Sequence, residues 1–578
     1  MAPLLLLMTM QHNKNTLIEA RQEPLVRPCS QPFYKAIAPY FLLFLLCALL
    51  YLPGITKIPV IDRDSAHFAQ ATRQMLETGH FFQIRFQEKT RFQKPPGINW
   101  LQAFFVQIVS TPASNEIWPY RIPSFLGGLF AVLASFAFAK RFLGASIAFL
   151  GATLLALSFL LTIEAHMAVI DPALLCATVL MQGALWQIYI KTLEGEKPAI
   201  GWAALFWGAM SFGFLLKGLT PWIAGLTLLA LILWDRKWQF RKALYLPYGL
   251  LFFLLSSGLW LFFVSRAEGQ NYLSAMFQKD LLPKLISGHE SHGMPLGFHS
   301  LLLPITFWPG SLFLYHTLKY TWQTKAHPSI KFLCAWCVPL FLFFELMPTK
   351  LPQYVLPAFP ALSILTACAM LRFEKEQPPF TRLLKILTLL WGILSLSIAA
   401  CVLIIPTKLM GDPPWVSYFI FAIFTLGTLA SLYFFRHKKM QKSLLCLILG
   451  SLISLPLFYQ YFLPSLEPLW LSKRVAQATT PFTPQYINNT HPLLVIGFGE
   501  PSLVFTLGTH QVKYVRIEEA LHALLEKKSY MILIRDHSEK ILLKKAAAFH
   551  IKLILQNTIH GFNYSKGQWR TLFLFQNI

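Results

Sequence analysis

Residues 37–55 of this chain read IAPYFLLFLLCALLYLPGI, and the charged segment DRDSAHFAQ follows at residues 62–70. Further along, residues 93–97 read QKPPG and place a lysine beside two prolines. The apolar run is long enough to cross the hydrocarbon layer of a membrane as a helix. The acids, the cations and the rigid Pro-Pro turn are therefore expected at the edge of the bilayer, where they could bind an anionic lipid headgroup.

The composition predicts a polytopic α-helical membrane protein. The chain has 578 residues, of which 55% are hydrophobic and 13% are charged, and its mean hydropathy is +0.51. A soluble globular protein cannot bury that much apolar surface. The formal net charge is +24, which in a soluble protein would suggest nucleic acid. In a membrane protein it indicates basic loops kept on the cytoplasmic side, so we expect no nucleic-acid partner.

Hydrophobic runs predict about thirteen transmembrane helices. The runs are 37–55, 119–139, 145–163, 172–190, 200–216, 219–234, 243–264, 298–317, 331–347, 353–371, 383–405, 414–435 and 443–463. Alternate connections carry clustered cations, which are Lys140-Arg141, Lys191 with Lys197, Arg236-Lys237 with Arg241-Lys242, Lys319 with Lys325, Arg372 with Lys375, and Arg436 with Lys438-Lys439. This alternation places those connections in the cytoplasm. An odd number of spans then leaves the C-terminus outside.

Three regions are expected along the chain. Residues 1–36 form a cytoplasmic tail, residues 37–471 a transmembrane domain with a periplasmic loop at 56–118, and residues 472–578 a small periplasmic α/β domain. In the loop, apolar residues from Phe68 to Leu76 recur at helical spacing, which predicts a helix on the membrane surface that Asp64 could cap. Residues 98–112 are apolar but short, so a re-entrant or interfacial helix is expected. No structural disulfide is expected among the eight cysteines.

Acidic residues are scarce in the membrane half and gather at the outer ends of spans. They are Asp62, Asp64, Glu88, Glu164, Asp171 and Glu345. Ionisable groups at such positions are candidates for function. Asp64 could accept a proton from an attacking hydroxyl or amine as a general base, and Asp62 could do the same. The alternative for Asp64 and for Asp171 is a purely structural role as a helix N-cap.

Three lysines on the outer side each lie beside glycine or proline. Lys94 precedes two prolines, Lys217 precedes Gly218, and Lys350 opens a segment that contains Tyr354. A lysine at the membrane boundary usually reaches towards phospholipid headgroups. Three of them against the positive-inside trend favour a site for a phosphate or diphosphate leaving group. Tyr354 could add a hydroxyl donor.

A polar loop between two spans contains a candidate metal site. His289, Glu290 and His292 lie close together there and could bind a divalent metal. Their spacing is not that of the H-E-x-x-H motif. Contact with a substrate and an ordinary loop structure are equally open alternatives.

In these motifs the chain resembles the bacterial membrane glycosyltransferases of the C-type fold, in particular the 4-amino-4-deoxy-L-arabinose lipid A transferase-like family. Protein mannosyltransferases are more distant relatives. The resembling residues occur in the order of the family and are Asp64 to Ala69, Arg73, Met75 to Gly79, Lys94 to Gly97 with Trp100, Asp171-Pro172, Lys217-Gly218, Gly288 to Gly293, and Lys350 to Pro352 with Tyr354 and Pro357.

The resemblance implies a polyprenyl-phosphate-linked sugar donor, a periplasmic acceptor such as lipid A, and inversion at the anomeric carbon. It implies a multi-pass protein of the bacterial inner membrane, surrounded by membrane lipids, with the active site and the C-terminal domain in the periplasm. It places Asp64 at the acceptor and Lys94 near the donor phosphate, with Asp171 as a second acid. Tyr354 would line the donor pocket. Further candidates for substrate binding are Lys217, Lys350, Arg73, His289 and His292.

The chain also departs from the family pattern. Ser65 and His67 stand where the family usually has Glu and Arg, and Gln93 stands where several relatives have Glu. Because of these departures, the resemblance gives weaker support for a metal site and for the identity of the sugar in this chain. We expect that no cofactor is required, since the lipid carrier holds the energy of activation, while a divalent metal stays open. The alternatives are a transporter or flippase of lipid-linked sugars, a protein O-mannosyltransferase-like enzyme, and a receptor or assembly protein.

Overall fold

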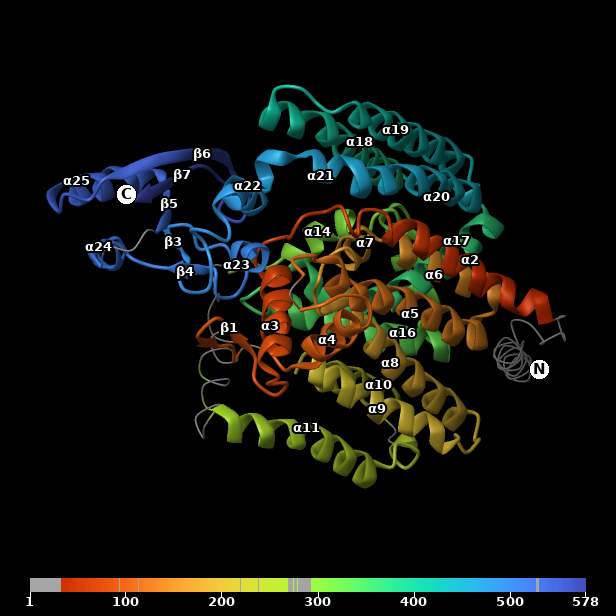
Figure 1. The fold of residues 1–578 in the computed structure, drawn as a ribbon. Coiled ribbons are helices and arrows are strands. Elements are labelled where there is room, and N and C mark those ends of the chain that lie inside the picture. Colours follow the sequence, from red (N-terminus) through yellow and green to blue (C-terminus); the bar gives the residue numbers. More distant parts are fainter. Residues whose placement is uncertain are drawn as a thin grey trace, which may run out of the picture.

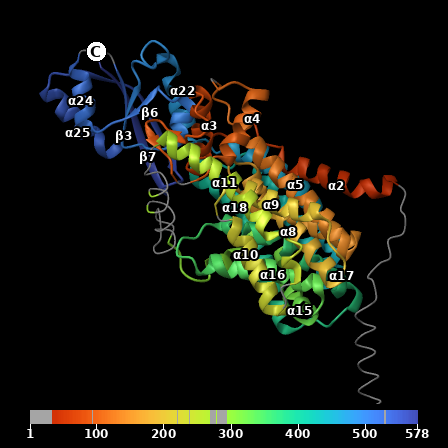
Figure 2. The ribbon, with the colours of Figure 1, turned by 90° about the horizontal axis from the view of Figure 1, so that it is seen from below.

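The computed structural model consists of a long helical body and a small sheet domain at one end of it (Figures 1 and 2). It describes residues 33–92, 94–112, 114–218, 220–236, 239–268, 274, 278, 293–526 and 530–577. The sheet domain is formed by the C-terminal part of the chain, and the short helices α3 and α4 lie between it and the body (Figure 2). The first 32 residues of the expected cytoplasmic tail lie outside the described ranges.

Each apolar run of the sequence forms helix in the body. The helices are α2 (Phe33–Tyr51), α5 (Trp118–Leu143), α6 (Ala145–Leu157), α7 (Phe159–Ala165), α8 (Asp171–Leu193), α9 (Ile200–Leu216), α10 (Thr220–Asp235), α11 (Leu246–Glu268), α14 (Phe298–Thr306), α15 (Leu314–Thr324), α16 (Pro328–Leu346), α17 (Phe359–Glu376), α18 (Arg382–Met410), α19 (Trp415–Arg436) and α20 (Met440–Leu457). A 3-10 helix, η5 (Pro352–Ala358), precedes α17.

The expected count of about thirteen spans is not confirmed. Among the described residues, eight helices are long and apolar enough to cross a membrane, and up to ten if each bent pair counts as one span. The runs at 145–163 and 298–317 are broken by bends of 60° and 112°. Residues 37–51, 200–216 and 220–235 form shorter apolar helices. Hydropathy reports how apolar a segment is, but not whether the helix is straight or long enough.

The predicted amphipathic helix is present as α3 (Asp64–Thr78), but it is not a surface helix. Ten of its residues are buried, from Ser65 to Met75. On one side α4 (Gly97–Val109) packs against it, and the Asn99 amide donates to the Phe68 carbonyl (3.2 Å) and the Thr72 hydroxyl (2.9 Å). On the other side Gln70 Nε2 donates to Thr509 of the C-terminal domain (2.8 Å). The amphipathic pattern reports that one face is apolar, but not whether lipid or protein covers it, and here the partner is protein.

The C-terminal domain is a five-stranded mixed sheet, as the expected α/β class requires. Its strands are β3 (Leu493–Ile496), β4 (Val512–Tyr514), β5 (Met531–Arg535), β6 (Leu553–Asn563) and β7 (Gln568–Asn577), in the order β4-β3-β5-β7-β6. Strand β3 is parallel to β4 and β5, and β7 is antiparallel to β5 and β6. The main helices are α22 (Leu471–Thr479), α23 (Pro501–Leu507), α24 (Ile517–Leu525) and α25 (Asp536–Ala548).

Both faces of this sheet are covered. Alternate residues of β3 point to opposite faces, so that Leu493 and Val495 join one apolar cluster and Leu494 and Ile496 join another. The first cluster includes residues of α22 and α23, which face the membrane body, and the second includes residues of α24 and α25. The body also contributes a hairpin, β1 (Arg85–Phe86) and β2 (Lys89–Thr90), whose Phe86 packs against the first cluster.

Arg121 fixes the segment that leads from α2 to the charged loop. Its side chain is fully buried in α5. One terminal nitrogen donates to the carbonyls of Ile55 and Ile58 (both 2.7 Å), and the other donates to the carbonyl of Pro59 (2.8 Å). One guanidinium group therefore satisfies three backbone acceptors that the chain leaves unpaired where α2 has ended.

Replacing Arg121 by Met should destabilise the protein by about 2–4 kcal/mol, because three buried carbonyls would lose their donor. The expected result is a lower thermal unfolding midpoint of the purified protein in detergent. Arg382→Met is the matched control, since Arg382 is exposed at the start of α18. Equal midpoints for the two variants would contradict this role of Arg121.

Candidate active site

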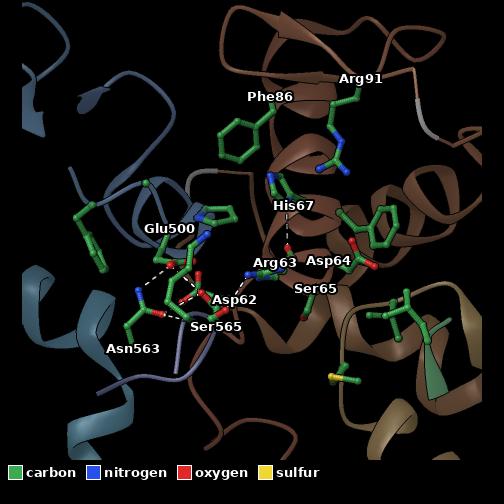
Figure 3. Close-up of a pocket in the computed structure, with 18 of the residues that line it drawn as sticks. Asp62, Arg63, Asp64, Ser65, His67, Phe86, Arg91, Glu500, Asn563 and Ser565 are labelled. Carbon is green, nitrogen blue, oxygen red and sulfur yellow. Dashed lines mark hydrogen bonds between the residues drawn. The ribbon is translucent and has the colours of Figure 1, made fainter. Parts of the chain in front are cut away.

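A cavity of about 1020 Å³ lies where the membrane body meets the C-terminal domain. Its walls come from the start of α3, the segment around β2, residues near Tyr354, and the loops and strand ends of the sheet domain (Figure 3). The basic residues that line it are Arg63, Lys89, Arg91, Lys94, Arg535, Lys566 and Arg570, and the acidic ones are Asp62, Asp64, Glu164 and Glu500. Seven cations against four acids make this cavity suitable for an anionic ligand.

The backbone at Arg63 separates the two aspartates that flank it. Arg63 has a φ of 66°, a conformation that costs a residue with a side chain about 1–2 kcal/mol. Its guanidinium donates to the Ser565 carbonyl (2.7 Å), and its own carbonyl accepts from the His67 backbone N–H (2.9 Å). In Figure 3 Asp62 accordingly turns towards the C-terminal domain, while Asp64 lies on the side of the membrane body.

Asp64 presents an exposed carboxylate to the cavity. It is the first residue of α3, whose positive N-terminal end favours a negative charge. The helix has no side-chain cap, so the alternative in which Asp64 serves as the N-cap is wrong. Within the described part of the chain its carboxylate forms no hydrogen bond or ion pair. An accessible, unpaired carboxylate is what a general base requires.

His67 lies one helical turn from Asp64 and is neutral. Burial lowers its pKa to about 4, and the charge of Arg91 acts in the same direction. Its Nδ1 lies 3.0 Å from the Arg63 carbonyl and therefore carries the proton that it donates. The ring also packs against Phe86, with the ring centroids 4.9 Å apart. His67 thus adds a polar but uncharged surface where the resembling family usually has an arginine.

Lys94 lines the same cavity as Asp64 and is half-buried. It is followed by Pro95 and Pro96, and α4 begins directly after them at Gly97. A side chain at position 97 would lie 2.5 Å from the Leu215 carbonyl oxygen, so only glycine allows α4 to lie against the end of α9. The structure therefore brings together the general-base and the anion-binding candidates that the sequence placed about 30 residues apart.

Asp171, Lys217 and Tyr354 form a buried group behind the cavity wall. Lys217 Nζ lies 2.9 Å from Asp171 Oδ1 and 4.8 Å from the centre of the Tyr354 ring. Asp171 is the first residue of α8 and makes an ion pair instead of a cap, because that helix has no side-chain cap. Tyr354 reaches the cavity, whereas Lys217 and Asp171 do not line it. The Lys217–Asp171 ion pair therefore packs behind Tyr354, outside the lining of the cavity.

Glu164 of α7 also lies in the cavity wall. Its side chain is almost fully buried, and Oε2 has no hydrogen-bond partner among the described residues. The sequence singled it out only as one acid among several. Glu345, another of those acids, lies elsewhere, where its Oε2 is 3.0 Å from Nδ1 of His299. Residue type alone could not distinguish the two positions.

Two predicted ligands of the substrate lie away from the cavity. Lys350 is 3% exposed and donates to the carbonyls of Met347 (2.6 Å) and Met294 (3.1 Å), so its ammonium group serves the backbone. Arg73 donates to Glu77 (2.9 Å), Asn115 (2.8 Å) and the Phe505 carbonyl (2.9 Å). Neither residue lines the cavity. Arg73 holds α3 to α23 instead.

Asp62 connects the charged loop to the C-terminal domain. Its Oδ1 accepts from the Ser502 backbone N–H (2.9 Å), and its own backbone N–H donates to the Tyr564 hydroxyl (2.7 Å). Burial raises the pKa of Asp62 from 3.8 to about 7, and the charge of Glu500 acts in the same direction. The geometry gives this acid a structural partner, in contrast to Asp64.

The predicted metal ligands His289, Glu290 and His292 lie outside the described residues, as does Gln93. In the part of the chain that is described, no group of three His, Cys, Asp or Glu side chains could hold a metal ion. The sequence also gave no indication that Arg535, Lys566 and Arg570 of the C-terminal domain line the cavity. Arg535 is the last residue of β5, Lys566 lies between β6 and β7, and Arg570 lies near the start of β7. Nothing in the local sequence shows which way the domain faces.

Comparisons with known proteins agree with this architecture. Residues 93–262 match the family described as dolichyl-phosphate-mannose-protein mannosyltransferase. An undecaprenyl phosphate-α-4-amino-4-deoxy-L-arabinose arabinosyl transferase of Pseudomonas fluorescens is 28% identical over 336 residues, which are 58% of this chain and 60% of that protein. A transferase of the same printed name from Pseudomonas paraeruginosa is 27% identical over 334 residues. The chain thus spans less than two thirds of the length of these relatives.

Solved structures show the same fold over nearly the whole chain. The crystal structure of ArnT from Cupriavidus metallidurans bound to undecaprenyl phosphate has a TM-score of 0.72 and 17% identity, and covers 94% of this chain and 98% of its own. The oligosaccharyltransferase of Archaeoglobus fulgidus is more distant, with a TM-score of 0.52 and 12% identity over 87% of this chain. The predicted resemblance to C-type membrane glycosyltransferases and the multi-span membrane fold are confirmed.

The docking of the C-terminal domain should weaken as pH rises from about 4 to about 7. The folded protein holds a proton on Asp62 up to about pH 7, whereas the unfolded chain releases it near its usual pKa of 3.8. Ionisation of the folded protein leaves a buried charge near Glu500, so stability falls over this range. Asp62→Asn keeps the acceptor for Ser502 and should flatten the pH dependence of the thermal unfolding midpoint. Asp412→Asn, at an exposed site, is the control. The assignment would be refuted if the unfolding midpoint depended on pH in the same way in the wild-type protein and in both variants.

Proposed function

We propose that this chain, which has the fold of the C-type membrane glycosyltransferases, transfers a sugar from a polyprenyl-phosphate carrier to a periplasmic acceptor. The observation that carries the proposal is the cavity that is lined both by Lys94 and by Asp64, whose carboxylate has no partner among the described residues. The similar ArnT structure contains undecaprenyl phosphate. The printed names of the relatives favour an aminoarabinose-type donor sugar, and the resemblance of the sequence motifs favours lipid A as the acceptor.

The reaction is a single displacement. Asp64 takes the proton of the acceptor hydroxyl while the acceptor oxygen forms a bond to the anomeric carbon. The bond between that carbon and the phosphate oxygen breaks, and the electron pair leaves with the polyprenyl phosphate. Lys94 offsets the charge that develops on the leaving phosphate, and Tyr354 lines the donor side. Attack opposite to the leaving group inverts the configuration.

Lys217 and Asp171 act as positioning residues in this proposal. The Lys217 ammonium group lies over the face of the Tyr354 ring, and the mostly buried Asp171 carboxylate forms an ion pair with it. Moving Tyr354 would change the shape of the donor side without removing a group that touches the reacting atoms. No nucleotide is required, because the lipid-linked phosphate is already a leaving group. A divalent metal at His289, Glu290 and His292 stays a prediction. It would be supported if a chelator abolished the activity and added metal restored it.

The proposed orientation places the cavity in the periplasm. Asp171 begins α8 behind the cavity, and Lys191 is in the last turn of the same helix. Tyr354 lies in η5 at the cavity, and Lys375 is in the last turn of α17, which follows it. Clustered cations therefore lie at helix ends opposite to the cavity, which is the pattern of cytoplasmic ends. A cysteine introduced at exposed Lys566 should react with a membrane-impermeant thiol reagent in intact spheroplasts.

A protein hydroxyl is the second candidate acceptor. The family that matches residues 93–262 is described as a protein mannosyltransferase family. The donor chemistry would be unchanged, because the same carboxylate could deprotonate a serine or threonine hydroxyl. Mass spectrometry of lipid A and of periplasmic proteins from cells with and without this protein separates the two acceptors. A flippase or an assembly protein would modify neither of them.

Asp64→Asn should reduce transfer by about 10²–10⁴-fold, because the amide cannot take up the proton of the acceptor. The measurement is consumption of a purified polyprenyl-phosphate-linked aminosugar in the presence of a lipid A extract. Asp412→Asn is the matched control, since Asp412 is exposed and does not line the cavity. Normal activity of folded Asp64→Asn protein would exclude the proposed general base.

Lys94→Met should lower kcat/KM for the lipid-linked donor by about 10–100-fold, since a charge-assisted contact to phosphate would be lost. Lys408→Met is the control, because Lys408 is an exposed lysine at the C-terminal end of α18. The two variants should unfold at similar temperatures. An unchanged kcat/KM for Lys94→Met would remove this lysine from the donor site.

A further inference from the structure

We propose that the end of the helical body opposite to the active-site cavity binds the phosphate group of an anionic phospholipid. A second cavity, of about 130 Å³, lies there between α15, the last turn of α17 and the start of α18. The charged residues that line this distal pocket are Lys319, Arg372 and Glu376, and the polar residues include His316. The pocket takes no part in the reaction proposed above.

The distal pocket is separated from the active-site cavity by the length of one helix. Tyr354 of η5 lines the active-site cavity, and α17 follows η5 directly and ends at Glu376, which lines the distal pocket. A helix rises about 1.5 Å per residue, so this helix keeps the two cavities roughly 25 Å apart. Figure 2 shows α15 and α17 at the end of the body that lies away from the sheet domain. One headgroup cannot occupy both places.

His316 is a buried polar group that the protein leaves without a partner. It is 6% exposed and lines the distal pocket, and neither Nδ1 nor Nε2 has a hydrogen-bond partner among the described residues. Phe373 and Phe435 pack edge-to-face against the ring, with centroids 3.9 and 5.8 Å away. An imidazole carries at least one N–H donor in each of its ordinary states, and a buried donor without a partner is unfavourable. A ligand oxygen in the pocket would satisfy this donor.

Two cations supply the charge that an anionic ligand needs. Lys319 is exposed, and its ammonium group forms no hydrogen bond or ion pair within the described chain. Arg372 Nε lies 2.6 Å from Glu376 Oε1, in an exposed ion pair that contributes little stability. The terminal nitrogens of Arg372 form no hydrogen bond with a described residue. A guanidinium presents donors that match two phosphate oxygens, so the pocket suits a phosphate group.

The start of α18 adds positive potential to the same pocket. Thr381 is the N-cap of this 29-residue helix and accepts from the Leu384 backbone N–H (3.2 Å). Both residues line the pocket. The N-terminal end of a helix carries a partial positive charge and is a common site for phosphate groups. The helix end, the two cations and the unpartnered histidine therefore converge on one cavity.

Exposed apolar side chains beside the pocket favour a lipid over a free phosphate ion. Leu318 of α15, next to Lys319, is 73% exposed, and Leu383 and Ile386 in the first turns of α18 are 54% and 55% exposed. Trp322 of α15 is exposed, and Lys325 Nζ lies 3.5 Å from its ring centre. Tryptophan and lysine together are typical of the bilayer interface. A phospholipid could therefore place its phosphate in the pocket and its acyl chains along these helices.

The orientation proposed above gives this lipid a leaflet. The distal pocket lies at the helix ends that carry clustered cations, which that orientation places in the cytoplasm. Basic pockets between helices on the cytoplasmic side are suited to anionic headgroups. The binding itself does not depend on the orientation, because it rests on the groups that line the pocket.

The test counts bound lipid on full-length, delipidated protein in detergent by native mass spectrometry. The probes are phosphatidylglycerol and a diacylglycerol with the same acyl chains. We expect one phosphatidylglycerol to bind roughly tenfold more tightly than the diacylglycerol, and Lys319→Ala with Arg372→Ala to lose this tightly bound lipid. Arg436→Ala with Lys442→Ala is the control, since it removes the same two residue types from exposed positions outside the pocket. This control should keep the tightly bound lipid.

A second variant tests the histidine separately from the charges. His316→Phe keeps an aromatic ring against Phe373 and removes both ring nitrogens. Its thermal unfolding midpoint without lipid should equal or exceed that of the wild-type protein, because an unsatisfied buried group is gone. The rise in the midpoint on addition of phosphatidylglycerol should be smaller than in the wild-type protein. His437→Phe, at an exposed position outside the pocket, is the control and should show the full rise.

Inorganic phosphate distinguishes the two sources of the anion. Displacement of phosphatidylglycerol by an equal concentration of inorganic phosphate would show a site for a soluble ion and overturn the assignment to a lipid. Equal binding of phosphatidylglycerol by the wild-type protein and a folded Lys319→Ala, Arg372→Ala variant would also overturn it, as would a full lipid-induced rise in His316→Phe. Sugar transfer is not needed for any of these measurements, so their failure leaves the proposed function untouched.

Discussion

The unusual backbone at Arg63 is the constraint on which the site depends. It sends two neighbouring aspartates in opposite directions, and the cost of this conformation is offset by the contact between Arg63 and Ser565. Asp62 is consequently used for assembly of the two domains, while the Asp64 carboxylate has no hydrogen bond or ion pair with any residue that the structure describes. The two aspartates perform different tasks because the backbone turns between them, and the contact of Arg63 with Ser565 of the C-terminal domain stabilises this turn.

Docking also determines what the cavity is. Arg73 and Gln70 of α3 contact the C-terminal domain, and residues of the β1–β2 hairpin pack against its apolar cluster. Without these contacts Asp64 would face open water, where a carboxylate is a poor catalyst and a lipid-linked sugar could be hydrolysed. In the proposed reaction, the C-terminal domain thus closes a site whose donor stays anchored in the bilayer. Buried ion pairs such as Lys217 with Asp171 contribute little net stability, so support of Tyr354 is the better reason for their presence.

Much of the fold could be predicted because its signals are local. The apolar runs form helices, α3 begins at Asp64 as its helical spacing indicates, and residues 472–578 form the expected α/β domain. The number of spans could not be predicted, since the bends of 60° and 112° leave no mark in hydropathy. The roles of Arg73 and Asp62 were also hidden. Their partners in the C-terminal domain are 432 and 440 positions away, and no pattern within a short segment reports such contacts.

The division of the cavity into two walls follows from the physical demands on a lipid-linked reaction. In the proposed reaction, a polyprenyl tail confines the donor phosphate to the membrane edge, and Lys94 and the start of α3 line the cavity that receives it. Another wall of the same cavity belongs to the C-terminal domain. Strands β5 and β7 hold Arg535 and Arg570 of this wall in fixed register. The proposed catalysis then depends on the distance between the two walls, and the Asp62 and Arg63 contacts set that distance.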